Sequence, residues 1–375
     1  MIKPYRILDW WLARRRGNTT RPGKPDGVLV ISSGGLGDTV LFAHVAERFL
    51  ALARDGEPVT VVLRADAMNM AFLLPPPASV VGVDFKRLGR DLGYRRRATD
   101  DVFRAHYRLV IHTDFRRHPD LDEALVAAAM APEAVAMEPR PWRKYDARLR
   151  ANRRLYTRLF DSGAPHLDKV VRWSRFAAWL SGRDAPPPVA RLDDRRLPAP
   201  AADAPDVVMQ PFSAVKRKQS PPALWRRIIA ALPRGTSVVV TGARGDLDAN
   251  PEFKALLELP GVRFDASGFA DLVPTLRAAR LVVSVDTALM HLAVAVGAPT
   301  LCLASAAFVG EIVPYDPAIA PANVRFVYHS MPCEGCLGDC VLPAEGGMFP
   351  CVARLDGERI VAEARAMLAA AGGRR

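Results

Sequence analysis

The chain has 375 residues, of which half are hydrophobic and a quarter are charged, the composition of an ordinary globular protein with about two domains. No apolar run approaches the roughly 18 residues of a membrane span, and the N-terminus lacks the pattern of a signal peptide, so we expect neither. The formal charge of +12 suits nucleic acid, anionic lipid or phosphorylated sugars as partners, but no zinc-finger, RNP or basic-zipper pattern supports nucleic acid.

Residues 1–24 form a basic, amphipathic segment. Two Trp residues, with Ile and Leu, precede the cluster Arg14–Arg16. A segment of this kind can lie on an anionic membrane surface. The alternatives are a frayed terminus and a helix that packs on the body of the protein.

Residues 25–183 repeat the order strand, polar loop, helix, which predicts an α/β domain with a parallel sheet. The expected strands are Val28–Ile31, Val59–Leu63, Val80–Val83 and Leu109–Ile111, and the expected helices are Thr39–Leu50 and Val170–Leu180.

A glycine-rich turn, Ser32–Asp38, joins the first strand to the first helix. Glycines let the backbone approach a ligand closely. The third glycine of a dinucleotide fingerprint is missing, because Val40 stands in its place, and this argues against a nicotinamide site. Asp38 lies at the mouth of the turn and is either a general base or a helix cap.

Basic residues follow other strands of this half at the same sheet edge. Arg64 ends the second strand, and Arg116 and Arg117 follow the fourth. Much of the positive charge lies in this half, so we expect an anionic ligand there.

The stretch 184–205 is rich in Pro and Ala and predicts a linker. A second α/β domain is expected at 206–353, followed by a C-terminal helix at 354–375. Its expected strands are Val207–Met209, Ser237–Thr241, Val262–Phe264, Leu281–Val285 and Thr300–Ala304, and its helices Pro221–Leu232, Asp271–Ala279 and Ala288–Val296. Two such domains favour a ligand cleft between them.

The stretch Leu281–Pro299 predicts a strand, a polar turn and a short helix. Asp286, Thr287 and His291 would lie at the carboxyl edge of the sheet, where ligands bind. The helix N-terminus suits a phosphate, and Asp286 suits a sugar hydroxyl. Alternatively, Asp286 or Thr287 only caps the helix, and His291 packs beneath it.

A basic loop, Gln210–Pro222, follows the first strand of the second domain. Lys216, Arg217 and Lys218 can neutralise a leaving phosphate there, or form a solvated basic loop. A second glycine turn begins at Gly242.

Four of the five cysteines lie near the end of the chain, at Cys333, Cys336, Cys340 and Cys351. Their spacing is compatible with four thiolate ligands of zinc or iron. Free thiols and a structural disulfide are the alternatives.

Three stretches resemble the glycosyltransferase family 9 heptosyltransferases: Ser33–Asp38, Gln210–Pro222 and Ser284–Pro299. The resemblance extends from about Val28 to Leu368. It implies a GT-B fold, in which two Rossmann-like domains face an interdomain cleft. It also implies inverting sugar transfer from a nucleotide sugar, with ADP-heptose favoured, to a lipopolysaccharide-type or other anionic surface-glycan acceptor, with no cofactor for catalysis.

The resemblance also implies roles for single residues. Asp38 would be the general base, although a carboxylate with a pKa near 4 accepts the proton only late in the reaction. Lys218 would balance the departing diphosphate, Asp286 would hold the ribose or sugar, and the Thr287 and Ala288 N–H groups would hold the phosphates. The full donor set is Gly37, Ser213, Lys216, Gly242, Asp286, Thr287, Ala288 and His291, and the acceptor set is Arg64, Arg116 and Arg117.

Departures from the family pattern leave a second interpretation. Phe212 and Ala288 stand where the family usually has glycine, which would narrow the nucleotide site. The alternative function is therefore a sugar-nucleotide-binding protein without catalysis, in a glycan-assembly complex. For the enzyme we expect a cytoplasmic location, peripheral on the inner face of the cytoplasmic membrane.

Overall fold

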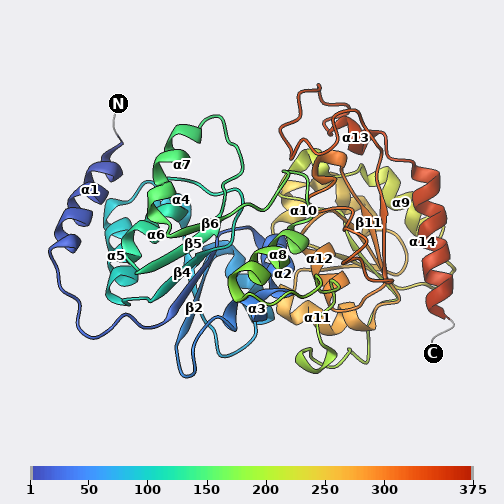
Figure 1. Ribbon diagram of the computed structural model, residues 1–375. Coiled ribbons are helices and arrows are strands. Elements are labelled where there is room, and N and C mark those ends of the chain that lie inside the picture. The colour runs from blue at the N-terminus through green and yellow to red at the C-terminus, as the bar shows by residue number, and fades with distance from the viewer. Residues whose placement is uncertain (1–2, 373–375) are drawn as a thin grey trace. The chain divides into compact units, whose positions relative to one another are not determined.

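The computed structural model describes residues 3–372. The chain divides into two compact units. The N-terminal unit contains residues 1–165 and 172–187, and the C-terminal unit contains residues 166–171 and 188–375. Each unit is built on a parallel sheet with helices against it (Figure 1).

The sheet of the N-terminal unit has six strands in the order β3-β2-β1-β4-β5-β6, and all neighbours are parallel. Its strands are β1 (Val28–Ser32), β2 (Val59–Arg64), β3 (Ser79–Val83), β4 (Leu109–His112), β5 (Glu133–Met137) and β6 (Arg158–Phe160). Its helices are α1 (Pro4–Gly17), α2 (Leu36–Ala43), α3 (Ala46–Leu50), α4 (Phe85–Leu88), α5 (Leu92–Arg104), α6 (Asp122–Ala129), α7 (Asp146–Asn152) and most of α8 (Lys169–Ser181).

The C-terminal unit repeats this topology. Its six parallel strands have the order β12-β11-β10-β7-β8-β9. They are β7 (Val207–Gln210), β8 (Val238–Thr241), β9 (Val262–Asp265), β10 (Leu281–Val285), β11 (Thr300–Leu303) and β12 (Val324–Val327). The helices are α9 (Pro222–Ala230), α10 (Asp246–Ala249), α11 (Phe269–Ala278), α12 (Ala288–Ala295), α13 (Pro350–Ala353) and α14 (Gly357–Gly372).

The central strands explain why these sequences form parallel sheets. Every residue of β1, β4 and β10 is buried. Strands covered on both faces need a continuous apolar run rather than an alternating one. The expected strands were predicted from such runs. The strand order reverses between β1 and β4 and between β7 and β10. In such sheets ligands bind beyond the carboxyl ends of the strands at this switch point.

Three strands were not expected from the sequence: β5, β6 and β12. Strands β6 and β12 are short and contain Arg, and the buried apolar run 134–137 of β5 was overlooked. The expected helix Thr39–Leu50 starts earlier, at Leu36, and is divided into α2 and α3.

The Pro- and Ala-rich stretch 188–205 belongs to the C-terminal unit. The Ala190 N–H donates to the Ile319 carbonyl, and the Leu192 N–H donates to the Ala295 carbonyl, each at 2.8 Å. This part of the chain is therefore held against the unit by its backbone.

The N-terminal segment is a helix packed on the body, one of the alternatives that the sequence left open. Helix α1 lies beside α5 (Figure 1) and buries Tyr5, Leu12 and Arg16. Among the described residues, no helix combines the length and hydropathy needed to cross a bilayer.

Candidate active site

The glycine-rich loop after β1 runs directly into α2. The Asp38 side chain folds back and accepts a hydrogen bond from the Gly35 N–H at 2.8 Å, which caps the first turn of the helix. Gly34 leaves room for this contact, because a Cβ there would lie 2.5 Å from the Asp38 Cβ. Gly37 lies in the same first turn. The carboxylate of Asp38 is thereby held at the carboxyl end of β1.

Arg64 approaches this loop from the end of β2. A Cβ on Gly35 would lie 3.2 Å from its guanidinium. Pairing with Asp66 raises the pKa of Arg64, and the charge of Asp38 raises it further. A fixed positive charge therefore lies beside Asp38.

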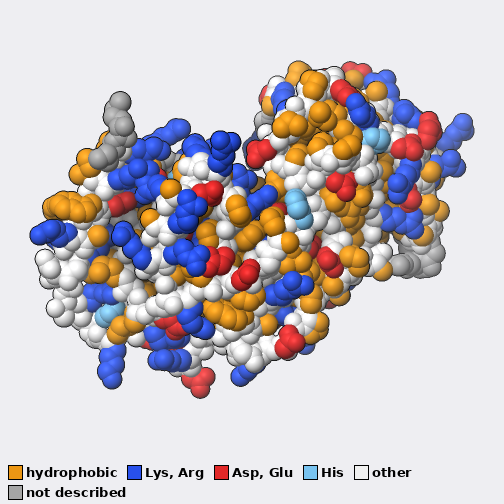
Figure 2. Space-filling model, turned by 45° about the horizontal axis from the view of Figure 1, so that its top comes forward, with side chains coloured by type: hydrophobic (Ala, Val, Ile, Leu, Met, Phe, Trp, Pro, Cys, Tyr) orange, Lys and Arg blue, Asp and Glu red, His pale blue; other side chains and the backbone are white. Residues whose placement is uncertain are grey.

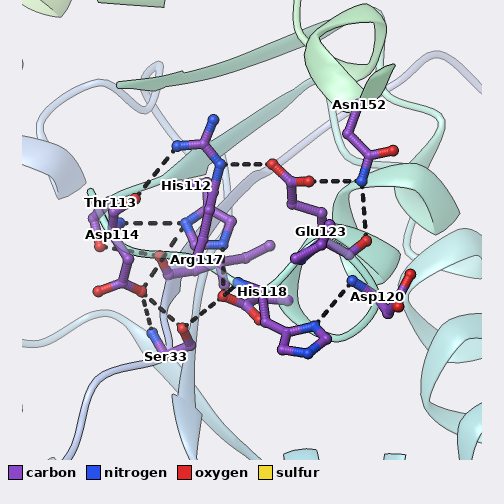
Figure 3. Close-up of polar contacts among 12 residues, drawn as sticks. Ser33, His112, Thr113, Asp114, Arg117, His118, Asp120, Glu123 and Asn152 are labelled. Carbon is purple, nitrogen blue, oxygen red and sulfur yellow. Dashed lines mark hydrogen bonds and ion pairs between the residues drawn. The ribbon is translucent and has the colours of Figure 1, made fainter. Parts of the chain in front are cut away.

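A buried polar network fixes the loop to the neighbouring strand (Figure 3). The Ser33 N–H and hydroxyl donate to one oxygen of Asp114, at 2.6 and 2.9 Å, and the hydroxyl also lies 3.2 Å from Asp122. Burial opposes ionisation of Asp122, but His112 and the His118 N–H outweigh it and lower the pKa of this carboxyl. The loop between β1 and α2 is thus tied to the segment after β4, across the switch point.

Asp122 was not predicted to belong to this network. The available signal was its position as the first residue of the helix that follows the β4 loop, where a carboxylate can accept backbone N–H groups.

Arg117 corrects one prediction. Its side chain is buried and donates to Glu123 at 2.6 Å and to the Met137 carbonyl at 2.7 Å (Figure 3). Those bonds hold the unit together, so Arg117 is not placed to bind an acceptor. Arg116 is exposed and lies over the Trp142 ring at 4.5 Å. This half-buried Trp, which packs on Tyr145, was not predicted as a site residue.

In the C-terminal unit, Lys218 and Asp286 meet at the switch point between β7 and β10. The Lys218 ammonium donates to one Asp286 carboxylate oxygen and, at 2.7 Å, to the Asp286 carbonyl. The second carboxylate oxygen accepts from the Ser305 hydroxyl at 2.9 Å. Both side chains are at most 10% exposed. Two stretches 68 residues apart in the chain therefore meet here, and their direct ion pair was not predicted from the sequence.

The N-terminus of α12 follows this pair directly. Thr287 occupies the capping position in an extended conformation, yet its side chain makes no capping hydrogen bond. Asp286 is engaged with Lys218 and Ser305 instead. The first N–H groups, starting at Ala288, thus lack a side-chain acceptor, which is the arrangement that suits a phosphate.

His291 corrects a second prediction. It is buried on α12, with its Nδ1 2.6 Å from the Tyr315 hydroxyl and its ring stacked on that of Tyr315. This is the packed histidine that the sequence left as the alternative. Its ring is engaged with Tyr315 in the interior of the unit.

Phe212 is likewise part of the core. Its ring is buried and packs on Phe253 and Phe264, so it does not narrow a nucleotide site in the way that the sequence suggested. A Cβ on Gly242 would come within 2.7 Å of this ring. It would also lie 2.8 Å from an Asp246 carboxylate oxygen, so packing already requires a glycine at 242.

Two further predicted donor residues lie in the basic loop. The Ser213 hydroxyl accepts from the Val215 N–H at 3.2 Å and so shapes the turn. Lys216 is exposed and donates to the Ala249 carbonyl at 2.7 Å, at the end of α10.

Cys333, Cys336, Cys340 and Cys351 line one small cavity of about 10 Å³. All four are free thiols, and this excludes the disulfide alternative in this structure. Within residues 3–372, however, no three His, Cys, Asp or Glu side chains are close enough together to hold a metal ion. The thiols share a cavity without forming a metal-ligating cluster.

Comparison with protein families gives one match. Residues 126–331 fit the model of glycosyltransferase family 9 (heptosyltransferase). This covers more than half of the chain. None of the curated proteins compared with the chain matches it.

Solved structures share the fold over nearly the whole length. The ADP-heptose lps heptosyltransferase II of E. coli is 16% identical and superposes with a TM-score of 0.60, over 92% of this chain and 99% of its own. The glycosyl transferase family 9 protein of Veillonella parvula DSM 2008 is 15% identical, with a TM-score of 0.63 over 92% and 98%. E. coli heptosyltransferase WaaC, solved with ADP-2-deoxy-2-fluoro heptose, is 18% identical, with a TM-score of 0.60 over 83% and 97%.

These likenesses confirm the expected fold class: two α/β units with parallel sheets, as in the GT-B heptosyltransferases. Together with the family match, they identify the chain as a glycosyltransferase that belongs to glycosyltransferase family 9, the heptosyltransferase family.

Proposed function

We propose that this protein transfers a heptose from ADP-heptose to a hydroxyl of an anionic, lipopolysaccharide-type glycan. The observation that carries the proposal is the α12 N-terminus, which lacks a side-chain cap and stands beside the Lys218–Asp286 pair. Helix N–H groups and an ammonium together form a site for a diphosphate. Of the E. coli proteins named above, one is an ADP-heptose heptosyltransferase and the other was solved with ADP-2-deoxy-2-fluoro heptose.

The donor is proposed to bind the C-terminal unit. The α12 N-terminus would hold the phosphates, and Asp286 would accept a hydrogen bond from a ribose or sugar hydroxyl. Lys218 would turn toward the diphosphate as negative charge develops on it, and Ser305 would remain with Asp286. Ser213 and Lys216 would border this site as secondary contacts.

The acceptor is proposed to bind the N-terminal unit. Arg64 and Arg116 would attract its anionic groups, and the half-buried Trp142 would offer an apolar plane for a sugar ring. Asp38 would accept the proton of the attacking hydroxyl.

The proposed reaction is a single displacement with inversion. The acceptor oxygen forms a bond to the anomeric carbon while the bond from that carbon to the phosphate oxygen breaks. The proton goes to Asp38, and the electron pair of the broken bond stays on the diphosphate, where Lys218 and the helix N-terminus balance it. No cofactor takes part in these steps.

Asp38→Asn tests catalysis separately from binding. The variant should bind the donor as the wild type does, measured by the thermal shift with ADP-heptose, but should transfer sugar at least a hundredfold more slowly. Its melting temperature without donor controls for the lost capping contact with Gly35. If turnover persisted, the mechanism would be wrong. If the wild type bound the donor tightly but showed neither transfer nor slow hydrolysis, the non-catalytic binding protein would be the better description.

A panel of ADP-, UDP-, GDP- and CDP-sugars tests the donor. A ligand that binds only the folded state raises the free energy of unfolding by about 2.7 kcal/mol at a hundred times its Kd. A selective shift with ADP-heptose supports the proposal, and a selective shift with another nucleotide sugar contradicts the donor assignment.

We further propose a structural zinc or iron ion at the four cysteines. Four cysteines line one cavity, and thiolates are donors that these metals prefer. Metal analysis of the purified protein should give close to one ion per chain, and Cys336→Ser should lower this content. Metal-free protein with four thiols that react with a thiol reagent would refute it.

We also propose that the reaction takes place at the inner face of the cytoplasmic membrane, because a lipid-linked acceptor would be held there.

A further inference from the structure

The outward face of α1 is more apolar than expected for a helix face that contacts only water. Ile7, Trp10 and Trp11 are 60%, 63% and 46% exposed. With Arg14 they follow the spacing i, i+3, i+4, i+7, which places them on one face of the helix. We call these four residues the outer face. The buried residues of α1 lie on the opposite side.

The inner side of α1 is locked to the N-terminal unit by polar contacts. Arg95 of α5 is fully buried and makes a two-pronged ion pair with Asp9, and it also donates to the carbonyls of Leu88 and Asp120. Arg16 donates to Asp100 at 2.7 Å. These contacts preform the helix and fix which face is turned outward.

The chemistry of the outer face matches a membrane interface. Trp side chains concentrate at the headgroup level of bilayers, and basic residues beside them bind anionic lipids. Arg14 lies over the Trp10 ring and Arg15 lies over the Trp11 ring, at 5.9 and 5.6 Å. In Figure 2, apolar side chains lie among Lys and Arg on the N-terminal unit.

The charge of the two units supports the same partner. The N-terminal unit contains 31 Lys and Arg against 20 Asp and Glu, a formal charge of +11, which leaves +1 for the C-terminal unit. Nearly the whole positive excess is therefore in the unit that carries α1. Such a charge attracts an anionic surface over about a Debye length.

We propose that α1 is a preformed docking helix that seats the N-terminal unit on an anionic lipid bilayer. Ile7, Trp10 and Trp11 enter the headgroup region, and Arg14 and Arg15 contact anionic headgroups. The inference deepens the membrane location in the proposed function, and rests on it, by naming the surface that makes the contact. It does not depend on which sugar is transferred.

Sedimentation with vesicles tests the proposal. The full-length protein should bind vesicles of phosphatidylcholine with 30% phosphatidylglycerol, and should bind pure phosphatidylcholine vesicles weakly. Arg14→Gln with Arg15→Gln should lower the partition coefficient by roughly 30-fold, since each basic residue near the surface contributes about 1 kcal/mol. Vesicle binding by the wild type should shift its Trp fluorescence to the blue. Trp10→Ser with Trp11→Ser should abolish this shift and lower binding at least tenfold. Val341→Ser, on the highly exposed Val341 of the C-terminal unit, is the matched control and should bind as the wild type does.

Three results would overturn the inference: no binding to anionic vesicles, equal binding by the Trp pair variant, or a wild-type dimer that becomes monomeric in that variant. The last result would assign the outer face to a second copy of the chain.

Far-ultraviolet circular dichroism should not change on vesicle binding, because the helix exists beforehand; a gain of helix would contradict the preformed state. Transfer to a soluble, delipidated acceptor should survive in the Trp pair variant. Vesicle binding without any sugar transfer would refute the proposed function but not the docking helix.

Discussion

Lys218 and Asp286 form a nearly buried ion pair in which each partner has further hydrogen bonds. The carboxylate accepts from Lys218 and Ser305, and the ammonium also donates to the Asp286 carbonyl. In the proposed reaction, the pair holds the ammonium beside the α12 N-terminus, and only the Lys218 side chain would have to turn to reach the diphosphate.

Lys218→Met should therefore lower kcat by about a hundredfold to a thousandfold, the usual effect of removing one group that stabilises developing charge. It also leaves the Asp286 carboxylate without its ion-pair partner, so the variant should be less stable by about 3 kcal/mol. Lys218→Arg keeps the positive charge, so comparison with Lys218→Met separates the effect on kcat from the effect on stability. Lys254→Met, on an exposed lysine, is the control, and the assay is steady-state transfer with a melting curve for each variant. A kcat within threefold of the wild type in a folded Lys218→Met protein would exclude the role.

Gly34 permits the position of the Asp38 carboxylate. A Cβ at this residue would lie 2.8 Å from one carboxylate oxygen and 2.5 Å from the Asp38 Cβ. Gly34→Ala should therefore displace Asp38 and lower kcat at least tenfold while the donor still produces its thermal shift. Gly245→Ala is the matched control, because a Cβ there meets nothing within 4 Å. Wild-type kcat in Gly34→Ala would mean that Asp38 need not occupy this position.

At the scale of elements, the apolar runs of the buried strands predicted β1, β4, β7 and β10, because a strand covered on both faces must be apolar throughout. The carboxyl ends of these strands then located the Asp38 loop and the Lys218 and Asp286 turns. The sequence could not predict the orientation of side chains farther along the loops that follow these strands. Arg117 is drawn inward by Glu123, which becomes its neighbour only after folding.

Gly242 illustrates the same limit. In the sequence it marks a glycine turn of the type that borders a ligand, whereas in the fold it makes space for the Phe212 ring. A glycine can leave space for a ligand or for a neighbouring side chain. Which of the two applies here depends on contacts between β7 and β8, and the local sequence pattern does not show these contacts. The capping contact of Asp38, by contrast, was one of the two alternatives predicted for this residue, and the structure contains it.

Helix α8 begins with a carboxylate that responds to pH. Asp168 accepts hydrogen bonds from the Val170, Val171 and Asp316 N–H groups. Burial nevertheless raises the pKa of Asp168 from 3.8 to about 6. The folded protein therefore binds more protons here than the unfolded chain between about pH 4 and pH 6, and the contribution of Asp168 to stability falls as the pH rises through this window.

Asp168→Asn should remove this contribution. The free energy of unfolding of the wild type minus that of Asp168→Asn should fall by about 2 kcal/mol between pH 4 and pH 7, and should be constant above pH 7. Denaturant unfolding of both proteins at several pH values measures the difference. Asp203→Asn, on an exposed carboxylate, should show no such trend. A constant difference for Asp168→Asn would contradict the raised pKa.

At the scale of the whole molecule, the two units have the same strand order but very different charge. Both sheets place a switch point between the first and fourth strands in chain order, so each unit offers one ligand edge. The N-terminal unit carries a formal charge of +11 and the C-terminal unit +1. The two units therefore share a topology, and charge is what distinguishes the ligands that we propose for them.

The asymmetry predicts how salt affects the two substrates. Attraction between the N-terminal unit and an anionic acceptor acts over distances that salt screens, because the Debye length falls from about 10 Å at 0.1 M to about 3 Å at 1 M. In the proposed donor site, the diphosphate would be held instead at short range, by helix N–H groups and a nearly buried lysine, and salt screens such contacts much less. Raising NaCl from 0.05 to 0.5 M should therefore increase the KM for a soluble, delipidated acceptor about tenfold and the KM for the donor less than threefold. Sodium sulfate at matched ionic strength controls for chloride, and the soluble acceptor removes any effect of membrane binding. Equal sensitivity of both KM values would mean that the charge of the N-terminal unit serves the bilayer alone and not the acceptor.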